Sequence, residues 1–516
     1  MINNFDFQDL FVLDMANNHQ GDLQHGLNIV RQHGEVIAKH GVRAALKFQF
    51  RNIETFIHPD HKVDSDNKHI PRFISTRLSA DDYRQLKDAV TNAGMISMCT
   101  PFDEESVDLI VDMDFDIIKV ASCSARDWPL LEAVAKTGKP VIFSTGGIKQ
   151  SEVDDMVSFF DHRGTDYAIM HCVPIYPTPS ELCNISNIGM FKHRYPSKVI
   201  GWSTHEDQDD TDPIIAAVAK GAQMFERHIG LVTDEISLNA YSSTPAQVDE
   251  WVKAWKKANT LCGSTSRLAP IPQEVDAIDG LKRGIFIKTE VEAGQPLSRD
   301  DVFFAMPYQE GQMSSGEWKD GIILNDTLNI NDPVGYDNVT IPPVSDVQVL
   351  KSAVHEVKAL LNVAGVQLGS EFEVEYSHHY GFKNFLETGT VIISCINREY
   401  CKKILVQLPG QHHPSHYHKR KEETFQVLWG ELKTELDGRT KTLQPGDTQL
   451  VMPGVWHRFW TDTGCVFEEV STTHFNNDSV YRDPQIEKLE RSERKTTVDH
   501  WGRIQLVDIV TGSSEA

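Results

Sequence analysis

Residues 96–145 read ISMCTPFDEESVDLIVDMDFDIIKVASCSARDWPLLEAVAKTGKPVIFST, in which three short apolar runs alternate with two amphipathic stretches. The amphipathic stretches place apolar residues three or four positions apart, which is helical spacing. The same alternation extends outward over residues 10–265. The apolar runs in that region are Phe11–Ala16, Ala44–Gln49, Ile96–Pro101, Asp116–Ser122, Val141–Thr145, Tyr167–Val173, Val199–His205 and Met224–Gly230.

This alternation predicts a parallel sheet, because strands joined through helices pair in parallel. Four of the intervening segments carry clear helical spacing, namely Tyr83–Ala93, Ser106–Met113, Leu130–Lys136 and Ile214–Lys220. Eight strand–helix units in roughly 250 residues fit a closed (β/α)8 or TIM barrel, an α/β fold. A doubly wound open sheet is the alternative, but the unit count and the length both favour the barrel.

Each apolar run finishes in polar or ionisable side chains. These are Asp14, Lys47, Thr100, Lys119, Ser144, His171, Ser203 with His205, and Glu226 with His228. The carboxyl ends of barrel strands form the active site, so these side chains are expected to face one cavity. A single polar residue there is usually a satisfied loop contact. Eight polar endings are hard to explain as packing, because buried charge without a partner is costly.

Two of these strand-end residues, Lys47 and Lys119, are lysines suited to hold a phosphate and a carboxylate. The hydroxyls of Thr100, Ser122, Ser144 and Ser203 would add hydrogen bonds to the same small anion. His205 and His228 end consecutive strands, so both imidazoles can reach one divalent cation. The alternatives are a salt bridge for each lysine and a hydrogen-bonded core position for each histidine.

The overall charge excludes some partners. The chain of 516 residues carries 50 Lys+Arg and 74 Asp+Glu, a formal charge of −24. Such a chain repels nucleic acid and anionic membrane surfaces, so we expect neither as a partner. We also expect no signal peptide, no membrane span and a cytoplasmic location. The eight cysteines lack CxxC spacing and are expected to be thiols in a reducing compartment.

Two breaks in the pattern divide the chain into three predicted domains. The barrel covers residues 1–265. A small β-rich module follows at 266–340, with strand-like runs at Gly284–Lys288, Gly321–Leu324 and Thr327–Ile330. After Ile341-Pro342-Pro343, β-branched and aromatic runs alternate with glycine turns to about residue 475, which is typical of an all-β barrel or sandwich. The last forty residues are polar and charged and are expected to form an extended strand or tail, so the third domain covers residues 345–516.

The all-β region contains a compact metal-ligand pattern. His416 and His418 alternate on one strand face, Glu423 follows, and His457 comes after a Pro-Gly turn. Three imidazole nitrogens and one carboxylate suit Zn²⁺, Mn²⁺ or Fe²⁺. The alternative is a polar sheet face rich in histidine and acid. His412, His413 and Tyr417 lie in the same cluster and receive no role.

The barrel residues resemble the sialic acid synthases. The resemblance rests on an ordered set of motifs over residues 10–230. These are VLDMANNHQG (12–21), LKFQ (46–49), CTPFD (99–103), IKVAS (118–122), TGKP (137–140), STG (144–146), HC (171–172), YPTP (176–179), GWSTH (201–205) and FERH (225–228). The module at 266–340 resembles the antifreeze-like (SAF) domain of those enzymes, and residues 345–516 resemble a cupin.

The resemblance implies a transferase that condenses phosphoenolpyruvate with an acylamino aldose and releases phosphate. His205 and His228 would bind Mn²⁺ or Mg²⁺ and, with Asp14 and Lys119, act in catalysis. Phosphoenolpyruvate and the sugar would be held by Lys47, Thr100, Lys119, Ser122, Ser144, Tyr176 and Ser203. The resemblance also implies a homodimer.

Several positions depart from the family pattern. Asp14 stands where the family has a glutamate, and Ser122-Cys123-Ser124 replaces Ser-Gly-Glu. Pro174 replaces an asparagine, an aspartate is missing near Leu238-Asn239, and Met306 stands where an arginine is expected in the SAF-like module. Apart from the carboxylate kept at Asp14, these departures lie on the sugar side, so we expect an aldose other than N-acetylmannosamine.

Residues 415–423, SHYHKRKEE, are similar to sugar isomerases of the lyxose isomerase type. That likeness implies a cupin that isomerises or binds a sugar at its metal. Two hypotheses follow for the whole chain. The first is a synthase of a sialic-acid-like sugar acid. The second is a non-catalytic carbohydrate-binding or regulatory protein that retains the phosphoenolpyruvate pocket.

Overall fold

The structure, a computed structural model, describes residues 5–63, 65–264 and 268–499. It contains two compact units, residues 1–269 and 270–516. The three-domain division with boundaries at 265, 340 and 345 remains a prediction. In the part of the chain that is described, no helix combines the length and apolarity needed to span a membrane.

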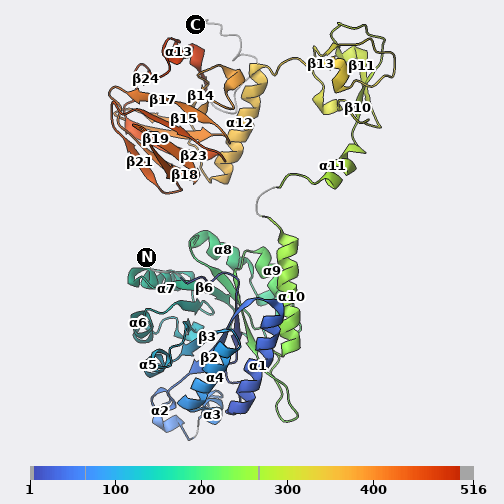
Figure 1. The fold of residues 1–516 in the computed structure, drawn as a ribbon. Helices are drawn as coiled ribbons and strands as arrows, with labels where there is room; N and C mark the ends of the chain where they lie inside the picture. The colour runs from blue at the N-terminus through green and yellow to red at the C-terminus, as the bar shows by residue number, and fades with distance from the viewer. Residues whose placement is uncertain (1–4, 64, 265–267, 500–516) are drawn as a thin grey trace. The chain divides into compact units, whose positions relative to one another are not determined.

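The first unit is a closed barrel of parallel strands with helices outside it (Figure 1). Neighbouring strands pair in sequence order, and β1 pairs with β8 to close the ring. The strands are β1 (Leu10–Asp14), β2 (Arg43–Phe50), β3 (Ile96–Pro101), β4 (Ile117–Val120), β5 (Val141–Ser144), β6 (Tyr167–Cys172), β7 (Ile200–Ser203) and β8 (Met224–Ile229). The predicted TIM barrel is therefore confirmed, and the open sheet is excluded by the β1–β8 pairing.

Helices cover the outside of the barrel and complete its core. They are α1 (Leu23–His40), α4 (Ala80–Asn92), α5 (Glu104–Asp112), α6 (Trp128–Lys136), α7 (Gln150–Arg163), α8 (Ser186–Arg194), α9 (Asp212–Ala219) and α10 (Pro245–Cys262). Short helices α2 (Ile53–Phe56) and α3 (Ile70–Ser75) and the two-residue strand β9 (Ser242–Ser243) lie in loops that follow strands. A large apolar core lies between strands and helices, and a smaller one fills the barrel interior. Burial on both faces explains why each strand is a continuous apolar run.

Residues 270–344 form a small region with its own apolar core. It contains α11 (Pro272–Asp279) and the strands β10 (Gly284–Ile287), β11 (Val302–Ala305), β12 (Ile323–Leu324) and β13 (Val339–Thr340). The expected strand at Thr327–Ile330 is absent: within that described segment only Leu328 forms an isolated bridge, to Val291. Leu328 packs into the small apolar core, but the segment has no continuous partner strand and so does not form a strand itself.

Two antiparallel sheets build the rest of the second unit (Figure 1). One has the order β21-β18-β23-β16-β15-β14-β25, and the other has the order β20-β19-β22-β17-β24. The strands are β14 (Glu373–Ser377), β15 (Thr390–Asn397), β16 (Tyr400–Gln407), β17 (His412–His418), β18 (Glu423–Gly430), β19 (Leu432–Leu436), β20 (Arg439–Leu443), β21 (Thr448–Val451), β22 (His457–Trp460), β23 (Cys465–Thr472), β24 (Ser479–Tyr481) and β25 (Lys495–Asp499). Apolar side chains from both sheets pack together in a core between the sheets.

Helices also occur in this region, so the prediction that it is all-β from residue 345 is wrong in this respect. Helix α12 (Asp346–Val363) begins at a capping box in which Ser345 and Gln348 bond each other's backbone. Its residues Leu350, Val357 and Leu361 pack on the outer face of the first sheet. The short helices α13 (Pro484–Glu487) and α14 (Arg491–Arg494) precede β25. Residues 500–516, part of the predicted cupin range, lie outside the described residues.

Candidate active site and metal centre

The carboxyl ends of the barrel strands bring the predicted ionisable residues together. Asp14 closes β1 and lies in register with Lys47 of β2 on one side and His228 of β8 on the other. Lys119 comes from β4, and His205 follows β7 directly. This arrangement follows from the parallel barrel, whose strands all finish at the same end.

A buried network of ion pairs connects four of these side chains. Lys47 Nζ lies 3.0 Å from Asp14 Oδ2 and also pairs with one oxygen of Glu226. Lys119 pairs with the other oxygen of Glu226. All four side chains are buried, so Glu226 is a bridge between two ammonium groups. The attraction within these pairs offsets part of the desolvation penalty that each buried charge carries.

The electrostatics of the network follow from burial and from these pairs. Burial opposes the charge on Glu226, but the two ammonium groups outweigh burial and hold the pKa of that carboxyl well below its usual range. Burial lowers the pKa of Lys119, because its one carboxylate partner, Glu226, is shared with Lys47. Lys47 has two carboxylate partners, and these outweigh burial and raise its pKa. Lys119 is therefore the less compensated cation of the pair.

Two imidazoles lie beside this network. The ring centroids of His205 and His228 are 5.3 Å apart. His205 Nδ1 lies 2.9 Å from the Val173 carbonyl oxygen, a contact that requires the proton on Nδ1 and leaves Nε2 with a lone pair. His228 Nδ1 lies 3.4 Å from Asp14 Oδ2. Burial lowers the pKa of both histidines, which favours the neutral form that a metal ligand needs.

Hydroxyl groups predicted as anion ligands surround the same strand ends. Thr100 Oγ1 is buried and makes no hydrogen bond within the described residues. An unpaired buried hydroxyl is uncommon and is a place where a ligand atom can bind. The Gly146 N–H donates to Ser122 Oγ over 3.0 Å, and an added Cβ on Gly146 would lie 2.8 Å from that oxygen. Ser144 and Ser203 are buried at the ends of their strands.

An aromatic rim covers the histidine pair. The Tyr176 ring lies 4.2 Å from that of His205, and the Tyr241 ring lies 5.3 Å from that of His228. The two tyrosine rings are 5.1 Å apart. Tyr176 was predicted from the sequence, whereas Tyr241 was not, because no strand ending or motif marks it.

A polar cavity of about 290 Å³ lies next to the network. Gln49 lines it and also donates to Asp14 Oδ2 over 3.5 Å. Arg51 lines it too, with its guanidinium between the rings of Phe73 and Phe102 at 4.0 and 3.6 Å. Arg51 was not predicted, because its position depends on contacts between segments far apart in the chain.

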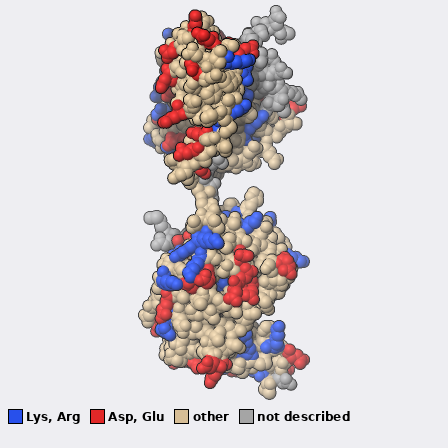
Figure 2. Space-filling view, turned by 90° about the vertical axis from the view of Figure 1, so that its right-hand side faces the viewer, with Lys and Arg blue, Asp and Glu red and all other residues tan. Residues whose placement is uncertain are grey.

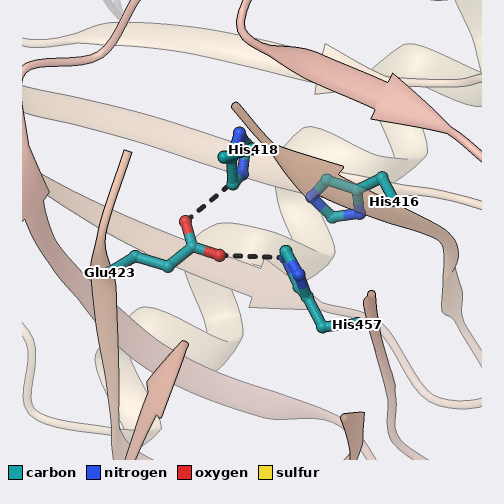
Figure 3. Close-up of side chains that lie close together, drawn as sticks. All are labelled: His416, His418, Glu423 and His457. Atoms are coloured by element: carbon teal, nitrogen blue, oxygen red, sulfur yellow. Dashed lines mark ion pairs between the residues drawn. The ribbon is translucent and has the colours of Figure 1, made fainter. Parts of the chain in front are cut away.

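The second unit holds the four predicted metal ligands in one cluster (Figure 3). His416 and His418 come from β17, Glu423 begins β18 and His457 begins β22. His416 and His457 are paired across strands β17 and β22. One ligand atom from each residue lies within 4.8 Å of the others, and all four residues are buried. Among the described residues, no other group of three or more His, Cys, Asp or Glu meets this criterion.

The tautomers of these histidines indicate a cation between them. His416 Nδ1 and His457 Nδ1 each lie 3.0 Å from a backbone carbonyl oxygen, so each Nδ1 carries the proton. His418 Nδ1 contacts the Ser479 hydroxyl at 3.2 Å. His457 Nε2 faces Glu423 Oε1 at 2.9 Å. Two electron-pair donors held this close fit a bound metal ion, and the Nδ1 contacts are the outer hydrogen bonds that metal-ligating histidines make.

Other histidines lie close to the cluster. His413, to which the sequence analysis gave no role, lies with its Nε2 3.1 Å from Nε2 of His379. The His413 ring is 4.7 Å from that of His416. His379 was missed because it sits between β14 and β15, outside any recognisable motif.

The comparisons with known proteins agree with this architecture. The NeuB family model matches residues 35–267, and the cupin domain model matches residues 404–468. The uncharacterised protein MJ1065 of Methanocaldococcus jannaschii is 32% identical over 292 residues, which cover 56% of this chain and 82% of that protein. The N-acetylneuraminate-9-phosphate synthase of Homo sapiens is 26% identical over 297 residues, covering 56% and 80% respectively.

A solved structure extends the match. A Chromobacterium violaceum protein assigned to spore coat polysaccharide biosynthesis is 40% identical, with a TM-score of 0.63, over 65% of this chain and 100% of that one. The chain belongs to the NeuB family and carries a C-terminal cupin domain.

Proposed function

We propose that the barrel condenses phosphoenolpyruvate with an aldose, giving a sialic-acid-like sugar acid and inorganic phosphate. The observation that carries the proposal is the pair of buried ammonium groups, Lys47 and Lys119, next to the imidazoles of His205 and His228. A relative named N-acetylneuraminate-9-phosphate synthase supports the same class of carbon–carbon bond-forming transferase.

Each residue has a role in this proposal. Lys47 and Lys119 hold the phosphate and carboxylate of phosphoenolpyruvate by charge-assisted hydrogen bonds, and Thr100, Ser122, Ser144 and Ser203 add neutral ones. Orientation by these groups accelerates the reaction by holding the reacting carbons close together. The Thr100 hydroxyl has no other hydrogen-bond partner among the described residues.

His205 and His228 fit a divalent ion, Mn²⁺ or Mg²⁺, because each is neutral and at least His205 presents a free Nε2. Such an ion, when bound, supplies Lewis acidity that polarises the aldehyde oxygen. The Tyr176 ring packs against His205, so it would border the aldehyde end of the sugar.

The bonds change as follows. The C3 carbon of phosphoenolpyruvate forms a bond to the aldehyde carbon, and the aldehyde oxygen takes up a proton. Water adds to C2 and loses one proton, which balances the proton taken up by the aldehyde oxygen. The C2–O bond to phosphate then breaks, and the new hydroxyl at C2 gives its proton to the leaving phosphate as it becomes the ketone. Asp14 is positioned to hold the proton that water releases, because it contacts both Lys47 and His228.

The cavity of about 290 Å³ beside Asp14 is the proposed place for the aldose. Gln49 lines the cavity and donates a hydrogen bond to Asp14 of the ion-pair network, so a sugar in the cavity would lie next to the enolpyruvate. Arg51 and Asn52 in its lining provide hydrogen-bond donors to sugar hydroxyl or acyl oxygens.

The other parts of the account are proposals too. Residues 266–340 are assigned as an SAF-like module and 345–516 as a cupin that binds Zn²⁺, Mn²⁺ or Fe²⁺ and either binds or isomerises a sugar. A homodimer is proposed by family resemblance. All eight cysteines are free thiols, which fits a reducing, cytoplasmic compartment where phosphoenolpyruvate is made.

Phosphate release tests the proposed function. The full chain is incubated with phosphoenolpyruvate, Mn²⁺ and a panel of N-acylated aldoses, and inorganic phosphate is measured. We expect release that depends on an aldose and that the His205→Ala variant abolishes, with the cupin metal content unchanged. Release from no aldose in the panel would instead favour a non-catalytic sugar-binding protein.

A further inference from the structure

The cupin contains a second cavity, of about 300 Å³, on the sheet that also carries Glu423 of the metal cluster. It lies at the low end of the size range of small-molecule sites, about 300–1,000 Å³. Its lining comes from β14, β15, β16, the loop after β23 and the segment around α14. The lining residues that carry charge are Glu373, Glu375, Lys403, Arg491 and Lys495.

A chain of ion pairs connects this cavity to the metal cluster. Lys403 Nζ, in the cavity wall, lies 3.3 Å from Glu469 Oε1. The same oxygen accepts from Lys421 Nζ over 2.9 Å, and Lys421 also pairs with the metal-ligand candidate Glu423. Lys403, Lys421, Glu469 and Glu423 are all buried, so the cavity and the cluster share one electrostatic environment.

Lys403 is the least compensated cation of this group. Its ammonium shares the single oxygen of Glu469 with Lys421, and its other contact is the neutral Nδ1 of His474 at 3.3 Å. A buried ammonium without a carboxylate of its own favours an anion as an additional partner. Elsewhere in the lining, Arg491 and Lys495 both pair with Glu375.

The charges of the cavity and the ion-pair chain balance before a metal is added. Four cations, Lys403, Lys421, Arg491 and Lys495, are matched by four carboxylates, Glu373, Glu375, Glu423 and Glu469. The neighbouring Asp478 is separately matched by Arg420. A bound divalent ion would add two positive charges to this set. A neutral sugar does not offset them, whereas a sugar with a negative group does.

We propose that the cupin cavity binds a monosaccharide that carries a carboxylate or phosphate group, with the anion against Lys403 and Arg491 and with binding strengthened by the metal ion. This inference rests on the proposed metal-binding cupin and not on the reaction of the barrel. The polar lining, which includes Ser394, Asn397 and Asn476, suits the sugar hydroxyls.

Calorimetric titration of the full chain tests the proposal. The probes are gluconate and glucuronate as carboxylates, glucose 6-phosphate as a phosphate, and glucose as the neutral control, each with Mn²⁺ and after chelation. We expect at least one anionic probe to bind at least tenfold more tightly than glucose, and to weaken at least fivefold without Mn²⁺. Which anion binds identifies the source of the charge.

Variants separate this site from the barrel. Lys403→Met should weaken the anionic probe at least tenfold, whereas Lys402→Met, next along β16 and half-exposed, should leave binding unchanged. Arg491→Gln, at a partly exposed position, provides a second test if Lys403→Met does not fold. The proposal is overturned if glucose binds as tightly as the anions, if no anionic probe binds, or if binding survives in the folded cavity variants.

Discussion

The Lys119→Met substitution tests the proposed phosphoenolpyruvate site most sharply. Lys119 is buried and its ion pair is with Glu226, which keeps its second partner Lys47 in the variant. A charge-assisted hydrogen bond contributes about 1.5–3 kcal/mol. At about 1.4 kcal/mol per tenfold, its loss predicts a rise of roughly 10- to 150-fold in KM for phosphoenolpyruvate.

The fold should survive this change, because methionine fills a similar volume and Glu226 remains paired. We expect a destabilisation smaller than the about 3–5 kcal/mol that follows when a buried charge loses all its partners. Steady-state phosphate release gives KM, and thermal unfolding checks the fold. Lys139→Met is the matched control, because Lys139 lies just before β5 and pairs with the exposed Asp114 instead of the buried Glu226. A folded Lys119→Met variant with KM within threefold of the wild type would refute the assignment.

Three further predictions follow from the same structure. Glu423→Gln should remove about one metal ion per chain, measured by elemental analysis, while phosphate release persists. Glu422 is the exposed neighbour, so the control variant Glu422→Gln should retain the metal. Equal metal loss in both variants would contradict the ligand assignment. Asp14→Asn should lower kcat by about 10²–10⁴-fold with a smaller change in KM, and an unchanged kcat would remove Asp14 from proton transfer. Burial opposes the charge on Glu375, but neighbouring cations outweigh burial and lower its pKa to about 2. The ionised carboxylate should therefore add about 3 kcal/mol to the free energy of unfolding. This contribution is complete above pH 4.5 and is lost as the pH falls towards 2. Urea unfolding across that range should show the wild type and Glu375→Gln converging at low pH, and a constant gap would contradict this.

The barrel could be predicted because its signal is local and repeated. Each predicted apolar run overlaps a strand, since burial on both faces requires continuous apolar residues. Helix α12 was not predicted, although Leu350, Val354, Val357 and Leu361 have helical spacing and Ser345 begins a capping box. The surrounding β-branched runs favoured a strand interpretation of the whole region.

The site could be predicted in its residue types but not in its connections. Strand endings indicated Lys47 and Lys119, and motif spacing indicated the four cupin residues. The bridge through Glu226 depends on side chains meeting across β2, β4 and β8, which no local pattern specifies. The chain from Glu423 to Lys403 was likewise hidden, because it links strands that are neighbours only in the folded sheet.

The most direct test of the central claim is a crystal structure of the full chain with phosphoenolpyruvate and Mn²⁺. The account predicts the phosphate and carboxylate of phosphoenolpyruvate within about 3 Å of Lys47 Nζ and Lys119 Nζ, the distance of a charge-assisted hydrogen bond. Mn²⁺ should then contact His205 and His228. Phosphoenolpyruvate bound away from both lysines would contradict the account.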